Sequence, residues 1–182
     1  MAKTLILGGA RSGKDTLAKM MGFKYQSSSE AALDLFLFPI LNDARHEMGF
    51  KEYRSLSEAF EDRVNHRDLW KTLIEEFNSK DRTRLATHML ADSDVYVGMR
   101  SNLEYQACMK KALFDHVIWV TAFDRVEPEP TSSFDIEFDA SIMSLVLNNG
   151  TEEELAEIAK SIKRDIQSNS MQMLYAKRIR GV

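Results

Sequence analysis

The chain has 182 residues, of which 44% are hydrophobic, and it carries a formal net charge of −4. A chain of this length can bury a full core and suits one domain, and its mild charge argues against a general nucleic-acid-binding protein. The single cysteine, Cys108, cannot form an internal disulfide, which indicates a reducing compartment, and its amphipathic helical surroundings favour a core residue over a nucleophile.

The sequence predicts a cytoplasmic protein without a membrane partner. The N-terminus lacks the layout of a signal peptide, because the apolar run of residues 5–7 stops at Gly8. The longest apolar-rich stretch, residues 31–41, carries Asp34 and Pro39 and is not expected to span a bilayer.

Hydrophobic periodicity predicts alternating strands and helices. In chain order, the elements expected in the first half are a strand over 4–7, a helix over 15–22, a strand over 23–27, and helical runs over 31–48 and 55–90. Those expected afterwards are a strand over 95–98, a helix over 102–113, a strand over 117–121, a polar loop over 123–138, a strand over 142–147 and a helix over 152–166. Ser29 and Thr151 are the expected N-caps, and Pro39 should kink or divide its helical run.

Five short strands that alternate with helices indicate an α/β fold, a parallel sheet with right-handed crossovers and helices on both faces. The single domain divides into the following parts: a core of residues 1–29, 93–122 and 139–169, a helical insertion of residues 30–92, a loop of residues 123–138, and a basic tail of residues 170–182. The pattern of the tail alone predicts no structure.

Residues 3–20, KTLILGGARSGKDTLAKM, place a glycine-bounded loop between a strand and a helix. Gly8, Gly13 and Lys14 fit the phosphate-binding pattern of glycine, four residues, glycine and lysine. Glycine permits backbone angles and a close approach that let N–H groups turn toward phosphate oxygens, and the lysine adds a positive charge. The sequence therefore predicts a nucleoside triphosphate site, formed in this segment by Arg11, Ser12, Gly13, Lys14, Asp15 and Thr16.

The expected magnesium ligands are unusual. A common phosphate-binding loop has Ser or Thr directly after the lysine, but Asp15 stands there and Thr16 comes second. Gly98 and Met99 precede Arg100 at the strand end where an acidic metal ligand is often found. We therefore expect Asp15 to hold Mg²⁺, with Thr16 adding a hydroxyl. Two alternatives stay open: Asp15 faces the acceptor substrate, or it is a helix-start acid favoured only by the helix dipole.

Basic side chains are expected near the same edge of the sheet. Arg100 follows a strand, where it can brace an anionic phosphate, and Glu104 at four residues' distance can orient it, the alternative being a solvated ion pair. In the insertion, Arg63 and Arg67 have the spacing of one helical face and can grip a monophosphate, while Trp70 can stack on a nucleobase. The alternative for Trp70 is a place in the core.

Three stretches resemble bacteriophage deoxynucleoside monophosphate kinases. The run GGARSGKDTLA is similar to their phosphate-binding loop, VYVGMRSNLE has a similar Arg followed four residues on by Glu, and LNNGTEEEL has their Asn-Asn-Gly-Thr turn. The resemblance implies a three-layer P-loop kinase fold, in which residues 30–92 bind the acceptor nucleotide and residues 123–138 form a short lid.

The resemblance also implies roles for further residues. Arg67 is the counterpart of an arginine that contacts the acceptor nucleotide, and Arg125 is the lid arginine that approaches the phosphates. Asn149 and Gly150 are expected beside the adenine of ATP, although an ordinary glycine turn with an N-cap explains Gly150 and Thr151 equally well. The catalytic residues expected in this way are Lys14, Asp15, Arg100 and Arg125.

The activity that the resemblance implies is transfer of the γ-phosphate of ATP to a deoxynucleoside monophosphate, with ATP and Mg²⁺ bound. Nucleotides are then the only expected partners, nucleic acid is not one, a homodimer is left open, and a phage-encoded chain would act in the host cytoplasm. The alternatives are a kinase for another phosphorylated metabolite and a nucleotide-binding regulatory protein without turnover, which the missing strand-end carboxylate suggests.

Overall fold

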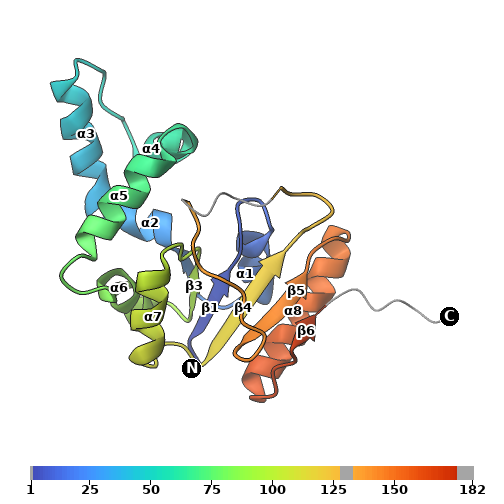
Figure 1. Ribbon diagram of the computed structural model, residues 1–182. Coiled ribbons are helices and arrows are strands. Elements are labelled where there is room, and N and C mark those ends of the chain that lie inside the picture. Colours follow the sequence, from blue (N-terminus) through green and yellow to red (C-terminus); the bar gives the residue numbers. More distant parts are fainter. Residues whose placement is uncertain (1, 128–132, 176–182) are drawn as a thin grey trace.

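The structure is a computed structural model in which residues 2–127 and 133–175 are described (Figure 1). Six strands, all parallel to their neighbours, form one sheet in the order β2-β3-β1-β4-β5-β6. The strands are β1 Thr4–Leu7, β2 Tyr25–Ser27, β3 Val95–Val97, β4 His116–Thr121, β5 Met143–Leu147 and β6 Leu174–Tyr175. The α/β class and the parallel sheet are confirmed, whereas the predicted number of five strands is wrong.

The sixth strand, β6, lies within residues 170–182, the segment predicted to be a basic tail. Leu174 pairs with Leu145 of β5, and Tyr175 pairs with Val146. The hydroxyl of Tyr175 is buried and donates a 3.0 Å hydrogen bond to the Asp165 carboxylate. A strand of two residues has no period of its own, so only these tertiary contacts define it.

Eight α-helices, one π-helix and one 3₁₀-helix accompany the strands in the described residues. They are α1 Lys14–Met21, α2 Ser28–Ala32, the π-helix η1 Leu33–Leu37, α3 Phe38–Glu47, α4 Leu56–Asp62, the 3₁₀-helix η2 Arg63–Asn65, α5 Arg67–Phe77, α6 Arg84–Asp92, α7 Asn102–Lys110 and α8 Glu152–Gln167. The run predicted over 55–90 is therefore four separate elements, because its apolar spacing does not show where the chain turns.

Local hydrogen bonds explain how the helices of the insertion begin. Ser27, rather than the predicted Ser29, caps α2, and the side chain of Glu30 completes a reciprocal capping box. Pro39 divides its run as predicted: it is the second residue of α3, and the N–H of Phe38 bonds to the carbonyl oxygen of Leu33. A π-helical turn thus precedes the proline, which has no N–H to continue the α-helical pattern.

Alternate residues of the strands supply two apolar cores. Leu5 and Leu7 of β1 face the core that includes α6 and α7, whereas Ile6 faces the core formed with α1 and α8. Figure 1 shows these two pairs of helices on opposite faces of the sheet. Cys108 lies in the first core, where burial raises the pKa of its thiol to about 12 and so disfavours the reactive thiolate.

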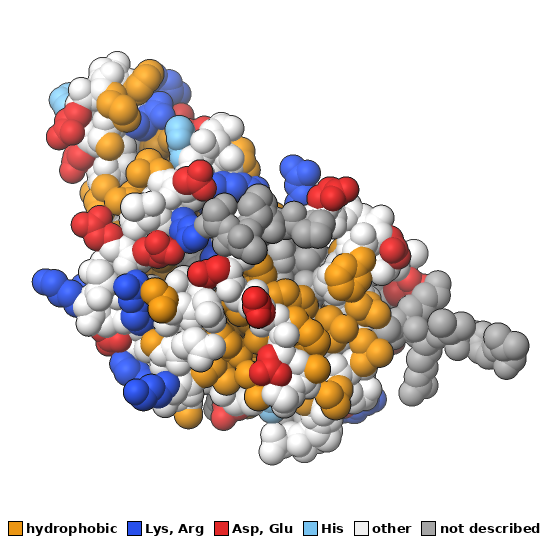
Figure 2. Space-filling view, viewed as in Figure 1, with side chains coloured by type: hydrophobic (Ala, Val, Ile, Leu, Met, Phe, Trp, Pro, Cys, Tyr) orange, Lys and Arg blue, Asp and Glu red, His pale blue; other side chains and the backbone are white. Residues whose placement is uncertain are grey.

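Part of the sheet is covered without a helix. The ring of Trp119 on β4 lies 5.3 Å from the ring of Phe134 and 5.9 Å from that of Phe138, both on the chain leading to β5. Figure 2 shows hydrophobic side chains gathered over β4 and β5 on this face. In the described parts of the chain, no helix has the length and apolar character needed to cross a membrane.

The insertion lies beyond the carboxyl ends of the strands. Helices α3, α4 and α5 project past the end of the sheet at which β1 leads into α1 (Figure 1). Open parallel sheets bind ligands at this end. The fold therefore brings the insertion and the glycine loop to the same edge.

Candidate functional site

The loop between β1 and α1 has left-handed backbone angles at three residues. The φ angle is 144° at Gly8, 61° at Arg11 and 91° at Gly13. A Cβ atom on Gly8 would lie 2.3 Å from the carbonyl oxygen of Val120, and one on Gly13 would lie 2.2 Å from Nδ2 of Asn148. Glycine is thus required by the close approach of β4 and of the end of β5, in addition to the turn itself.

Polar groups are concentrated in this loop. Lys14 is buried, and its Nζ donates to the carbonyl oxygen of Gly9 at 3.3 Å and lies 3.5 Å from the carboxylate of Asp15. Oγ of Ser12 is buried and has no hydrogen-bond partner within the described residues. Because a buried hydroxyl without a partner costs free energy, Ser12 is a group that a bound phosphate oxygen could satisfy.

Two cavities lie beside this loop, and the larger of these two, about 370 Å³, lies between the loop and the insertion. Its volume is in the range of small-molecule sites. The structure brings together here the following predicted site residues: Arg11, Lys14, Asp15, Arg63, Arg67, Trp70, Arg100 and Glu104. Sequence reasoning missed other side chains of its wall, including Ser27, Glu30, Lys71 and Ser133, because only the fold brings them to this edge.

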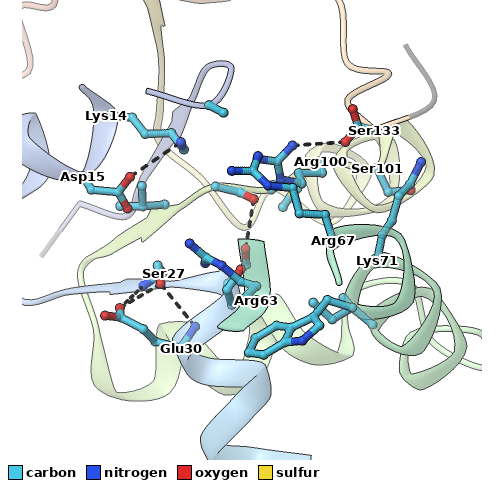
Figure 3. Close-up of a pocket in the computed structure, with 18 of the residues that line it drawn as sticks. Lys14, Asp15, Ser27, Glu30, Arg63, Arg67, Lys71, Arg100, Ser101 and Ser133 are labelled. Carbon is cyan, nitrogen blue, oxygen red and sulfur yellow. Dashed lines mark hydrogen bonds and ion pairs between the residues drawn. The ribbon is translucent and has the colours of Figure 1, made fainter. Parts of the chain in front are cut away.

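Arg63, Arg67 and Arg100 form a cationic cluster within the cavity. Figure 3 shows the side chains of Arg63, Arg67 and Arg100 gathered in it. Burial lowers the pKa of Arg63, and the charge of Arg67 lowers it further, whereas the charge of Asp15 raises it. A cluster of like charges is stabilised by an anion bound among them.

The three arginines come from different elements. Arg63 lies in η2 and Arg67 begins α5, so the expected single helical face is wrong, although both side chains reach the cavity. The guanidinium of Arg63 lies 4.2 Å from the centre of the Phe60 ring. Arg100 follows β3, and its Nη1 donates to the carbonyl oxygen of Ser133 at 3.2 Å.

Trp70 belongs to the core and to the cavity wall at once. Its side chain is buried with 3% exposure, and its ring lies edge-on to Phe60 at 6.3 Å. The core interpretation of Trp70 is therefore confirmed, and stacking on a nucleobase stays a prediction.

Glu104 does not orient Arg100 as expected. It is only 4% exposed, and its Oε1 accepts a 2.8 Å hydrogen bond from the hydroxyl of Tyr96. Burial raises the pKa of Glu104 to about 7, although the hydrogen bond from Tyr96 acts in the opposite direction. The expected pairing fails because the side chain of Glu104 turns into the core toward β3.

The smaller cavity, about 240 Å³, lies on the other side of the glycine loop. It is lined by Arg11, Gly13, Thr16, Arg125, Asn148, Gly150, Thr151, Glu152 and Leu155. Arg125 donates from Nε at 3.2 Å and from Nη2 at 2.5 Å to the carbonyl oxygen of Asn148. It therefore lies at this cavity and not with the arginines of the larger one.

Asn148 is the residue that sequence reasoning overlooked. Its Nδ2 donates to the carbonyl oxygen of Ser12 at 2.8 Å, and its backbone N–H donates to the carbonyl oxygen of Thr121 at 2.7 Å. Asn149, which we had selected, is exposed, and its Oδ1 accepts only a 3.5 Å contact from the N–H of Asp124. The sequence shows two adjacent asparagines after β5, and either could contact the glycine loop. Only the fold shows that Asn148 is the one that does.

The residues fit a magnesium ion in part. Asp15 lines the larger cavity and Thr16 the smaller one, and a magnesium site shared by these two residues stays a prediction. No group of three His, Cys, Asp or Glu side chains that could hold a metal occurs in residues 2–127 and 133–175. A magnesium ion that keeps its waters and binds phosphate oxygens needs only one or two carboxylates, and Asp15, with its side chain 60% exposed, can supply one.

The backbone angle of Gly98 disfavours a side chain at a position where the strand-end carboxylate is often found. Gly98 has a φ angle of 88°, and a Cβ atom there would lie 3.4 Å from Oγ of Ser28 and 3.7 Å from Cε of Lys14. A side chain at this position would be strained and would stand beside the lysine. The local geometry thus explains why glycine follows β3.

Comparison of the sequence with protein-family models gives no match, and comparison with curated proteins gives none either. The function is therefore argued from the site itself.

Proposed function

We propose that the chain is a P-loop kinase that transfers the γ-phosphate of ATP to a deoxynucleoside monophosphate, in the manner of the phage enzymes that it resembles. In this proposal, residues 30–92 form the region that binds the acceptor nucleotide, and residues 123–138 form the lid. Residues 128–132 of that lid lie outside the described residues.

The observation that carries the proposal is the pair of cavities that flank the glycine loop. One is lined by Lys14 and the arginine cluster, and the other by Gly13, Thr16 and Gly150. Arg11 lines both. A kinase that phosphorylates a nucleotide needs two nucleotide sites that meet at the transferring phosphate, and this arrangement supports ATP in the smaller cavity and the monophosphate in the larger one.

The chemistry that this arrangement favours requires position and charge rather than a general base. An oxygen of the acceptor monophosphate attacks the γ-phosphorus, and the bond from that phosphorus to the bridging oxygen breaks. The electron pair leaves with that oxygen on ADP, and the product is a deoxynucleoside diphosphate. Lys14 can follow the transferring group, while Arg63, Arg67 and Arg100 neutralise the attacking phosphate.

Magnesium would offset charge on the ATP phosphates when bound, and Asp15 is the side chain that we propose to hold it. Asp15 also lines the larger cavity, so a role in positioning the monophosphate stays open.

An assay of ADP release with ATP, Mg²⁺ and each of the four deoxynucleoside monophosphates tests the proposal. We expect release that depends on the monophosphate, and chromatography should identify the matching diphosphate. Lys14→Ala should abolish transfer, because the charge that follows the γ-phosphate is lost. Lys19→Ala is the matched control, since Lys19 is exposed on the same helix.

Three other outcomes would overturn or redirect the proposal. Tight ATP binding without release in the presence of any acceptor would favour a regulatory nucleotide-binding protein. Release that needs another phosphorylated metabolite would keep the kinase and change its substrate. Near-normal transfer by a folded Lys14→Ala variant would contradict the role of the glycine loop.

A further inference from the structure

The larger cavity is chemically divided. Besides burial, the groups that shift the pKa of Arg63 are the side chains of Arg67, Asp15, Arg100 and Glu30. Arg63 and the two arginines among these groups can bind a phosphate, and the carboxylates of Asp15 and Glu30 lie beside them. A monophosphate held there would leave its sugar and base to occupy the rest of the cavity.

The rest of the wall combines apolar and acidic side chains with Lys71, whose Nζ lies 3.8 Å from the carboxylate of Glu75. Trp70, Ile74 and Met99 contribute apolar surface, and Glu75 and Glu104 contribute carboxyl groups. An aromatic and apolar wall suits the face of a nucleobase, whereas carboxyl groups suit the N–H donors at its edge.

One carboxyl oxygen of Glu104, Oε2, can accept a hydrogen bond from the edge of a nucleobase. Its Oε1 accepts from the hydroxyl of Tyr96, and Oε2 accepts from no donor in residues 2–127 and 133–175. Oε2 is also not sealed in the core, because the buried side-chain atoms without a partner in those residues are Ser12 Oγ, Tyr105 Oη and His116 Nε2. Glu104 lines the cavity, and Oε2 is the carboxyl oxygen that remains to bind a ligand there.

We infer that Glu104 reads the base of the acceptor nucleotide and favours guanine, an inference that rests on the proposed function. Ionised Glu104 accepts hydrogen bonds and cannot donate them, so it selects a base edge rich in N–H groups. Because burial raises the pKa of Glu104 to about 7, the binding measurements below are made at pH 8, where the ionised form prevails. The hydroxyl of Tyr96 holds the carboxyl group through Oε1, which leaves Oε2 as the oxygen that can accept from a base.

Guanine is the base that meets this requirement best. Its N1–H and its 2-amino group are adjacent donors and can bind one carboxylate together. Adenine and cytosine offer an amino group beside a ring nitrogen that is itself an acceptor, and thymine offers one N–H between two carbonyl oxygens. Acceptor atoms that face a buried carboxylate without a donor between them weaken binding.

Calorimetric binding of the four deoxynucleoside monophosphates, followed by transfer assays with ATP, tests this inference. Wild type should bind dGMP most tightly. Glu104→Gln should weaken dGMP binding about ten- to a hundredfold, the range for hydrogen bonds to a charged group, and should change binding of the other three much less. Glu76→Gln is the control, because Glu76 is exposed on α5 and does not line the cavity.

Tyr96→Phe separates base reading from a structural role. It removes the hydrogen bond to Oε1 but keeps the carboxyl group, so the preference for dGMP should persist in this variant. If Glu104→Gln fails to fold, Glu104→Asp withdraws the carboxyl group by one methylene and should also lose the preference.

The outcomes distinguish this inference from the proposed function. An unchanged ranking of the four nucleotides in folded Glu104→Gln, with transfer intact, overturns the role of Glu104 and keeps the kinase. A dGMP preference that depends on Glu104, without any transfer, keeps the inference and overturns the kinase. If none of the four nucleotides binds wild type, both are wrong.

Discussion

The side-chain amide of Asn148 donates a 2.8 Å hydrogen bond to the carbonyl oxygen of Ser12, so the end of β5 holds the glycine loop across 136 positions of sequence. The carbonyl oxygen of Asn148 in turn accepts from Arg125. One buried residue therefore fixes the loop and an arginine of the smaller cavity together.

Asn148→Asp should raise the KM for ATP more than the KM for the monophosphate. The carboxylate has nearly the shape of the amide but places an acceptor against the carbonyl oxygen of Ser12. The loss of a buried hydrogen bond costs about 1–3 kcal/mol, which corresponds to about five- to a hundredfold in KM. Steady-state kinetics with each substrate varied measures this, and Gln167→Glu, on an exposed amide of α8, is the control. A loss of melting temperature with both KM values unchanged would assign Asn148 a purely structural role.

Arg67→Ala should have the opposite selectivity and raise the KM for the monophosphate about ten- to a hundredfold, because it removes a charge-assisted contact to phosphate. The KM for ATP should change little, since Arg67 does not line the smaller cavity. Arg54→Ala removes an exposed arginine of the same insertion and should have no effect. Equal changes in both KM values would count against this position for the monophosphate, and Arg63→Ala would then be measured.

Asp15→Asn should need more Mg²⁺ for half-maximal turnover than wild type and should lose on the order of a hundredfold in kcat, or about 2.7 kcal/mol. The structure places this carboxylate 3.5 Å from Nζ of Lys14, beside the expected phosphates. Turnover titrated with Mg²⁺ in the two proteins gives the comparison. Identical midpoints, combined with a raised monophosphate KM, would instead show that Asp15 positions the acceptor nucleotide.

Glu104 should make folding stability depend on pH. Burial raises its pKa from 4.5 to about 7, so between these values the folded protein binds more protons than the unfolded chain. Stability therefore falls as pH rises through this window, by on the order of 3 kcal/mol, and then levels off. Urea unfolding at pH 5 and pH 8 should show this decrease in wild type and in Glu76→Gln, and a much smaller one in Glu104→Gln. A decrease of the same size in Glu104→Gln would mean that another group is responsible.

Sequence predicted the features that depend on near neighbours in the chain. The loop from Gly8 to Lys14 and the apolar strands are local patterns, so their existence and type could be inferred. The partner of Glu104 could not, because four-residue spacing suggested Arg100 while packing turned the side chain toward Tyr96 on β3. Spacing limits which residues can meet, and the rotation of each side chain in the fold decides which ones do.

The same distinction explains the errors in the insertion and at the sheet edge. Arg63 and Arg67 have helical spacing, but the chain changes from a 3₁₀-helix to α5 between them. Asn148 and Asn149 are equivalent in a turn pattern, and only the proximity of Ser12 distinguishes them. Tyr175 joins the sheet through Val146 and Asp165, contacts that no local period encodes.

The strand order has a consequence for synthesis on the ribosome. β1 and β2 are not neighbours, and both pair with β3, so neither has a strand partner until residues 95–97 have emerged. The contact from Asn148 to Ser12 comes later still. Pairing over such sequence separations is slow and leaves apolar strands exposed in the nascent chain. The glycine loop is translated among the first residues. It can nevertheless reach its described shape only after most of the protein has been made.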